Sequence, residues 1–214
     1  AAITDVLDVL GGTGNIALGS GAMGVALTTG TDNVAIGENA LDAVTTGSNN
    51  TAVGDNAAGA TTTGGNNTAM GSNALLVNST GSGNVAIGDY TLDANTTASY
   101  NVAVGYAALS ANATGVGNVA LGKDALLVNL GSNNVAAGLD ALTANTTGGD
   151  NVAVGRLALT ANTTGGYNTA LGSTALTANT TASNNVAVGY NSLAANTTGT
   201  DNVAMGALAL DANT

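Results

Sequence analysis

A short motif that recurs twelve times at nearly fixed spacing constrains the fold of this chain more than any other feature. Each copy reads Asn, a variable residue, Ala, a variable residue and Gly, as in residues 33–37, 84–88 and 151–155. The motif Asn stands at positions 15, 33, 50, 67, 84, 101, 118, 134, 151, 168, 185 and 202, so the period is 17 residues with one interval of 18 and one of 16. Such a period is typical of a solenoid, in which every repeat is stable only against its neighbours.

The rest of each unit is also repetitive and reads Ala-Leu-x-Ala-Asn-Thr-Thr-Gly, as in residues 141–148 and 158–165. Gly, Asn and Thr-Thr interrupt every unit, so no stretch reaches the ~8–20 residues of a globular helix. The short β-branched runs favour strands. We therefore predict an all-β fold, a parallel β-solenoid of about twelve 17-residue coils, each with two short strands and two turns.

The motif also predicts which side of each strand faces inward. Successive side chains of a strand point to opposite faces, so the middle Ala lies on one face and its two neighbours lie on the other. Ala is invariant there in all twelve copies, whereas the neighbours vary among Val, Thr, Ile, Leu, Met and Ala. We place the Ala face in a narrow interior and the neighbours outside, as an inter-chain stripe that includes Val34, Ile36, Val85, Ile87, Val102, Val104, Val152, Val154, Val186 and Val188.

Three further groups of residues complete the predicted coil. The interior is expected to contain Ala35, Ala86, Ala103, Ala153, Leu41, Leu75, Leu92, Leu109, Leu142 and Leu159, with the smaller Ala43, Ala94 and Ala144. A positive φ is least costly for Gly, which predicts corners at Gly37, Gly88, Gly105 and Gly155. Asn tolerates the left-handed region and stacks into amide ladders, which predicts second corners at Asn95, Asn145 and Asn162. An alternative places Val, Ile and Leu inside a wider monomeric solenoid, with Ala outside.

A continuous Val/Ile stripe exceeds the apolar patches that soluble monomers usually expose. Self-association would cover it, and a side-by-side homotrimer is the simplest such assembly. A second possibility is a filament whose subunits stack end to end through uncapped solenoid ends. Residues 1–14 do not repeat and are expected to form a cap or assembly segment, while residues 15–214 form the repeat domain.

Composition bears on function chiefly by exclusion. Two basic residues against thirteen acidic ones give a net charge of −11, which leaves no basic surface for nucleic acid. The chain has no Cys or His, so we expect no catalytic nucleophile–base pair, no cofactor and no metal site. Asp32, Asp150 and Asp201 share one repeat position but lack neighbours that would complete a Ca²⁺ shell. No apolar run approaches the ~18 residues of a membrane span, and Ala1–Leu10 lacks the basic start of a signal peptide.

The polar turns allow two other interpretations. Asn-Thr-Thr matches the N-glycosylation sequon at Asn95, Asn145, Asn162, Asn179 and Asn196, although turn chemistry explains it without sugars. The same Thr rows suggest ice binding as a further alternative, but the array is not uniform. The five Tyr residues, at positions 90, 100, 106, 167 and 190, occur irregularly near turns, where surface variation explains them better than sugar stacking.

The motif with its preceding polar residue, as in residues 66–71 and 184–189, resembles the head repeats of YadA-like trimeric autotransporter adhesins and related repeats of phage tail fibres. The resemblance extends from Asn15 onward, although units in that family are usually shorter than 17 residues. It implies a left-handed parallel β-roll, three chains side by side, and attachment to a matrix or host surface through a receptor that the sequence does not identify. We therefore expect a non-catalytic structural segment of an extracellular fibre or adhesin shaft, on a cell surface or a virion.

Overall fold

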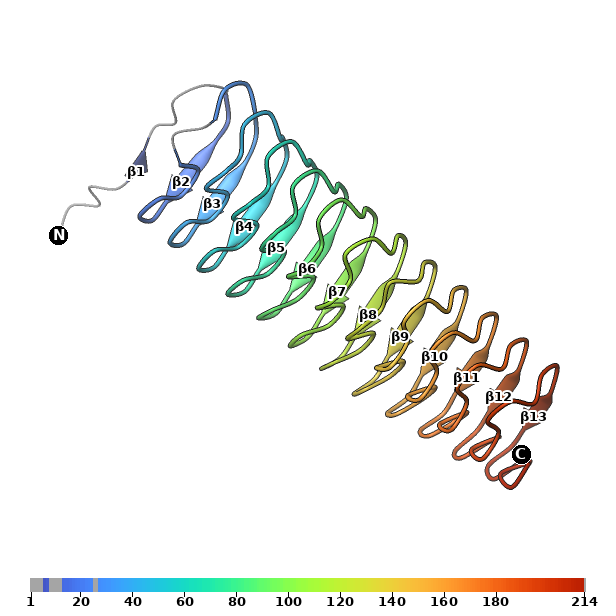
Figure 1. Ribbon diagram of the computed structural model, residues 1–214. Helices are drawn as coiled ribbons and strands as arrows, with labels where there is room; N and C mark the ends of the chain where they lie inside the picture. Colours follow the sequence, from blue (N-terminus) through green and yellow to red (C-terminus); the bar gives the residue numbers. More distant parts are fainter. Residues whose placement is uncertain (1–5, 8–12, 25–26, 214) are drawn as a thin grey trace.

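The computed structural model describes residues 6–7, 13–24 and 27–213, which form a rod built from stacked coils (Figure 1). The strands form one sheet in chain order: β1 (Val6–Leu7), β2 (Ile16–Leu18), β3 (Val34–Ile36), β4 (Thr51–Val53), β5 (Thr68–Met70), β6 (Val85–Ile87), β7 (Val102–Val104), β8 (Val119–Leu121), β9 (Val135–Ala137), β10 (Val152–Val154), β11 (Thr169–Leu171), β12 (Val186–Val188) and β13 (Val203–Met205). The twelve strands β2–β13 are parallel and span about eleven turns, which confirms the predicted β-solenoid.

The register keeps equivalent residues of successive coils directly above one another. Ala103 of β7, for example, lies opposite Ala86 of β6 and Ala120 of β8. The middle Ala of every strand from β3 to β12 is fully buried, and its two neighbours are partly or largely exposed. The alternative with Val and Ile inside and Ala outside is therefore wrong. A coil that closes within 17 residues leaves room for only a methyl group behind the strand.

Each coil contains one strand, so the predicted second strand is wrong. Ala141 and Leu142 are neighbours in sequence, yet both are fully buried, and an extended strand would send them to opposite faces. Asp140 (φ 55°) and Leu142 (φ 51°) instead adopt the left-handed conformation, which turns the chain so that both side chains enter the interior. The Leu column is thus internal as expected, at Leu92, Leu109, Leu142, Leu159 and their equivalents.

The turn also displaces the alanines predicted two residues further on. Ala43, Ala94 and Ala144 are only half-buried, because the left-handed Leu directs the chain outward after it. The inward position is filled instead by the alanine that directly precedes Leu, such as Ala141 and Ala158.

The Gly corners after the strands are confirmed, whereas the Asn corners are corrected. Gly155 has a φ of 133°, and a Cβ placed there would lie 2.5 Å from the carbonyl carbon and oxygen of Gly172 in the next coil. Gly37, Gly88 and Gly105 have similar φ values. The predicted left-handed Asn95, Asn145 and Asn162 do not have positive φ. That conformation occurs at the residue before the motif Asn, for example Asn184 with a φ of 61°.

Two ladders of buried asparagine side chains run along the rod, and the second of them confirms the amide stacking predicted for Asn95, Asn145 and Asn162. In the first ladder, formed by the motif asparagines, Asn151 Nδ2 donates to Asn134 Oδ1 (3.1 Å) and to the Gly165 carbonyl (2.9 Å). In the second ladder, Asn162 Nδ2 donates to Asn145 Oδ1 (2.8 Å) and also to Gly165 (2.9 Å). The amides therefore satisfy the buried carbonyls of the turns.

The segment before the repeats contributes the only antiparallel pairing in the described residues. Val6 lies opposite Leu18 and Leu7 opposite Ala17, so β1 covers the N-terminal edge of the β2–β13 sheet. The other residues expected in the 1–14 cap, except residues 13 and 14, lie outside the described residues. The 18-residue interval between Asn15 and Asn33 contains residues 25 and 26, which also lie outside them.

Candidate interaction surface

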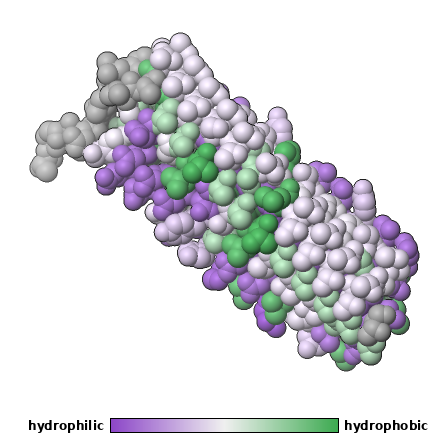
Figure 2. Space-filling model, viewed as in Figure 1, coloured by the Kyte–Doolittle hydropathy of each residue, from purple (hydrophilic) through white to green (hydrophobic). Residues whose placement is uncertain are grey.

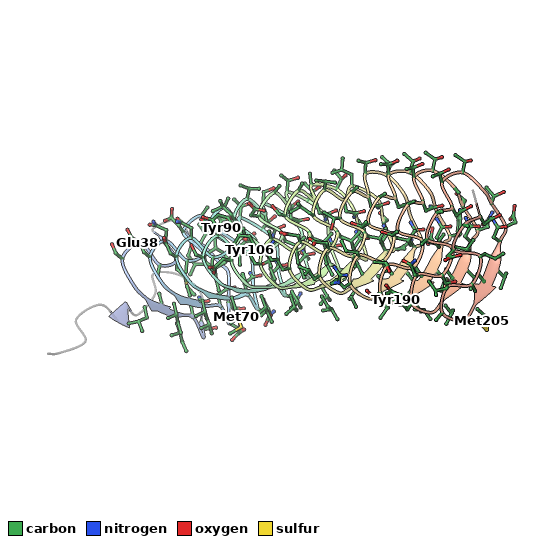
Figure 3. The ribbon with its side chains drawn as sticks, turned by 90° about the horizontal axis from the view of Figure 1, so that it is seen from below. Glu38, Met70, Tyr90, Tyr106, Tyr190 and Met205 are labelled. Atoms are coloured by element: carbon green, nitrogen blue, oxygen red, sulfur yellow. The ribbon has the colours of Figure 1, made fainter. Side chains whose placement is uncertain are left out.

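The apolar surface of the strands is the most extensive candidate site. The outward first and third residues of β2–β13 form two adjacent columns, which we call the strand stripe. Ile36 and Ile87 are each 37% exposed and Val154 is 40% exposed. The remaining predicted inter-chain residues, which are partly exposed, are Val34, Val85, Val102, Val104, Val152, Val186 and Val188. Figure 3 shows Met70 and Met205, from β5 and β13, projecting outward from the strand side of the rod.

The stripe is regular because the strands stay in register. Every strand pairs residue for residue with the next, so each outward column repeats once per coil along the rod. Space-filling atoms of the face in Figure 2 show hydrophobic patches among near-neutral and hydrophilic surface. A repetitive surface with methyl groups in regular rows can bury apolar area against a similar surface.

A second exposed column follows the corner glycines and borders the strand stripe. We call it the corner ridge, and its members are Ser20, Glu38, Asp55, Ser72, Asp89, Tyr106, Lys123, Leu139, Arg156, Ser173, Tyr190 and Ala207. All are exposed except the two half-buried members, Ser72 and Ser173. The ridge contains both basic residues of the chain. Sequence reasoning missed it as a unit, although reading the position two residues after each strand would have found it.

Aromatic and charged residues meet on the ridge near mid-chain. The Tyr90 and Tyr106 rings lie edge to face with centroids 6.0 Å apart, and Figure 3 shows them side by side. Lys123 Nζ lies 5.8 Å from the Tyr106 ring centroid and forms an ion pair with Asp124. The hydrogen bond to Asp124 raises the pKa of Lys123, assisted by the negative charge of Asp140 and opposed by desolvation. Lys123 is therefore a permanent cation at physiological pH.

In several Thr pairs the first hydroxyl hydrogen-bonds to the next coil at the surface of the solenoid. Thr146 Oγ1 donates to the Thr163 carbonyl (2.9 Å), and Thr163 Oγ1 donates to the Thr180 carbonyl (3.0 Å). The second Thr of each pair, such as Thr147 and Thr164, is exposed. The asparagines of the Asn-Thr-Thr sequons are fully buried with their Nδ2 groups hydrogen-bonded, so the folded rod offers them no access to a glycosylating enzyme. Ice binding stays a prediction from sequence.

The remaining surface features are an open depression and separate acidic residues in turns. An open depression of about 560 Å³ is lined by Asn39, Asp42, Ala43, Asn56, Gly59, Ala60, Leu76 and Val77. Gly59 has no side chain to fill this space. Asp32, Asp150 and Asp201 are exposed in turns, and the described residues contain no group of three metal-binding side chains. Within the same residues, no helix is long and apolar enough to cross a membrane.

Comparison with known proteins adds no assignment: no family model, curated protein or solved structure matches this chain. The likeness to the adhesin and tail-fibre repeats therefore rests on the motif alone.

Proposed function

We propose that this chain is a non-catalytic structural protein, a rigid segment of an extracellular fibre or adhesin shaft that assembles side by side through the strand stripe. The observation that carries the proposal is an exposed apolar stripe along a continuously hydrogen-bonded rod. A rod of this kind provides length and a repetitive surface, which are the properties that a shaft needs.

Rigidity follows from the way successive coils are joined. Val152 N–H donates to the Asn168 carbonyl (2.8 Å) and Gly155 N–H donates to the Ala137 carbonyl (2.8 Å), so each coil is bonded on both sides. The buried asparagine ladders add side-chain bonds between the same coils. Bending the rod sharply would break several of these bonds at once and expose buried amides, each of which costs about 1–3 kcal/mol when left unpaired.

Self-association is supported by the chemistry of the stripe. Its Val, Ile, Leu and Met side chains have no covering element among the described residues, and burying them against identical surfaces is worth roughly 25 cal/mol per Å². We propose three chains side by side as the assembly, and an extracellular site, on a cell surface or a virion, as its location.

The test is the mass of the purified chain in solution, measured by light scattering. We expect three times the 20.2 kDa chain mass for the unmodified protein, or six times if two such assemblies also pair through another surface. The double variant Ile87→Lys, Val104→Lys places two charges in the stripe and should lose the three-chain assembly, with an unchanged circular dichroism spectrum. Thr97→Lys with Thr114→Lys adds the same charge on an exposed turn and should remain associated. An unmodified chain that is monomeric at all concentrations would refute the proposal.

End-to-end filament formation is a second candidate because Val203 and Met205 of β13 are 64% and 73% exposed. The pairing of β1 with β2 counts against it, since a stacked neighbour would have to displace β1 from the opposite edge. Negative-stain images separate the two candidates, because discrete rods support the shaft and indefinite filaments support stacking.

A further inference from the structure

The charged residues of the corner ridge follow a definite order along the rod. Its charged members before Tyr106 are all acidic, namely Glu38, Asp55 and Asp89. Its charged members after Tyr106 are both basic, Lys123 and Arg156. The ridge is therefore negative in one half and positive in the other, although the chain as a whole is strongly acidic.

The spacing of these charges is symmetric about Tyr106. Asp89 stands one coil before Tyr106 and Lys123 one coil after it, while Asp55 stands three coils before and Arg156 three coils after. Because the coils stack in register, equal numbers of coils correspond to equal distances along the rod. If a second ridge runs in the opposite direction and is centred on Tyr106, each basic residue of one ridge therefore lies opposite an acidic residue of the other.

We infer that the corner ridge binds a second copy of this chain in the antiparallel direction, with a two-fold axis at Tyr106. In such a pair, Asp89 of one chain lies level with Lys123 of the other, and Asp55 lies level with Arg156. A two-fold contact is self-complementary, so each of these ion pairs forms twice. Tyr106 lies level with its own copy at the axis, where two exposed rings can pack together.

The neighbouring positions fit the same arrangement. Tyr90 becomes level with Asp124 of the second copy, where its hydroxyl can donate to the carboxylate. Glu38 becomes level with Ser173, and Ser72 with Leu139, so none of these positions opposes two like charges. In a parallel, in-register pair every ridge residue would instead lie level with its own copy, which sets acid against acid and base against base.

The ridge charges retain the capacity to form these contacts. Asp89 Oδ1 accepts the Ser72 N–H (3.0 Å) and Asp55 Oδ1 accepts Asn56 Nδ2 (2.9 Å), so the second oxygen of each carboxylate is available. Lys123 can bind two carboxylates because its ammonium group has three donors. Arg156 is exposed, and no ion pair involves it within the described ranges.

Pairing through the corner ridge does not depend on the trimer. The strand stripe and the corner ridge consist of different residues. The ridge can therefore pair two single rods or two side-by-side bundles. The expected consequence is a doubling of mass, which ridge variants abolish and stripe variants leave intact.

A charge-swap series tests the pairing by light scattering or analytical ultracentrifugation. Lys123→Glu with Arg156→Glu should weaken pairing about 100-fold, because both contacts become repulsive. Adding Asp55→Lys and Asp89→Lys to the same chain restores the net charge of −11 and every complementary contact, so this quadruple variant should pair with itself as tightly as the unmodified chain. It should not pair with the unmodified chain, because like charges then meet. A quadruple variant that fails to pair, or a mixture that pairs freely, would overturn the inference.

Disulfide trapping tests the direction independently, and the chain has no native cysteine to interfere. Ser72→Cys and Leu139→Cys are made in separate chains, mixed and oxidised mildly. The antiparallel pair predicts a crosslink between the two different variants and little crosslinking of either variant alone. Crosslinks within each single variant and none between them would show a parallel pair, which refutes the inference while leaving side-by-side assembly intact. A chain that is monomeric in both experiments would refute both proposals.

Discussion

Removing one amide from the first asparagine ladder should destabilise the rod strongly. Asn151→Ala removes four side-chain hydrogen bonds. Asn151 Nδ2 donates to Asn134 Oδ1 (3.1 Å) and to the Gly165 carbonyl (2.9 Å). Asn151 Oδ1 accepts from the backbone N–H (3.0 Å) and from Nδ2 (3.2 Å) of Asn168. Gly165 keeps a bond from Asn162, but the Asn168 N–H loses its acceptor and stays buried. Three of these bonds are worth about 1 kcal/mol each, and the orphaned Asn168 N–H costs about 1–3 kcal/mol in place of the fourth, which gives a loss of roughly 4–6 kcal/mol.

For a chain of this length, 1 kcal/mol corresponds to about 2–4 °C in Tm, so the midpoint should fall by roughly 8–24 °C. Thermal unfolding followed by circular dichroism measures the shift. The matched control is Asn184→Gly, which removes an exposed amide at a left-handed position that Gly tolerates, as Gly83 (φ 68°) shows at the equivalent site. Equal midpoints for Asn151→Ala and Asn184→Gly would refute the claim that the buried ladder holds the coils together.

Two further substitutions test the packing of the coil. Ala103→Leu should lower the free energy of unfolding by about 3 kcal/mol, because the closed interior has no room for three more carbons. Ala111→Leu, on the exposed turn, should change the free energy of unfolding by less than about 0.5 kcal/mol. Urea unfolding measures both variants, and similar values would contradict a narrow interior. Gly155→Ala should cost more than Gly206→Ala in the same assay, since both have positive φ but a Cβ at Gly206 meets nothing within 4 Å. Equal costs would show that backbone strain, and not contact with the next coil, excludes a side chain there.

The strand stripe was predictable because one face of the motif never varies. Ala at the middle position in all twelve copies indicated an interior that admits only a methyl group, and Ala103 is indeed fully buried. The corner ridge was present in the sequence as a column, but its exposure depends on how the turn after Gly105 directs Tyr106 outward. Exposure of a turn residue follows from the path of the whole coil, and the period alone does not fix that path.

The sequence by itself determined the period, the parallel in-register stack, the inward Ala column and the corner glycines, because each follows from a residue type repeated at a fixed interval. Only the tertiary structure decided how the second half of each coil turns. Leu seldom adopts a positive φ, which costs about 1–2 kcal/mol, so no local rule predicts it at Leu142. The cost is met by contacts with the next coil, where the Leu142 N–H bonds the Ala158 carbonyl (3.0 Å) and the side chain becomes fully buried.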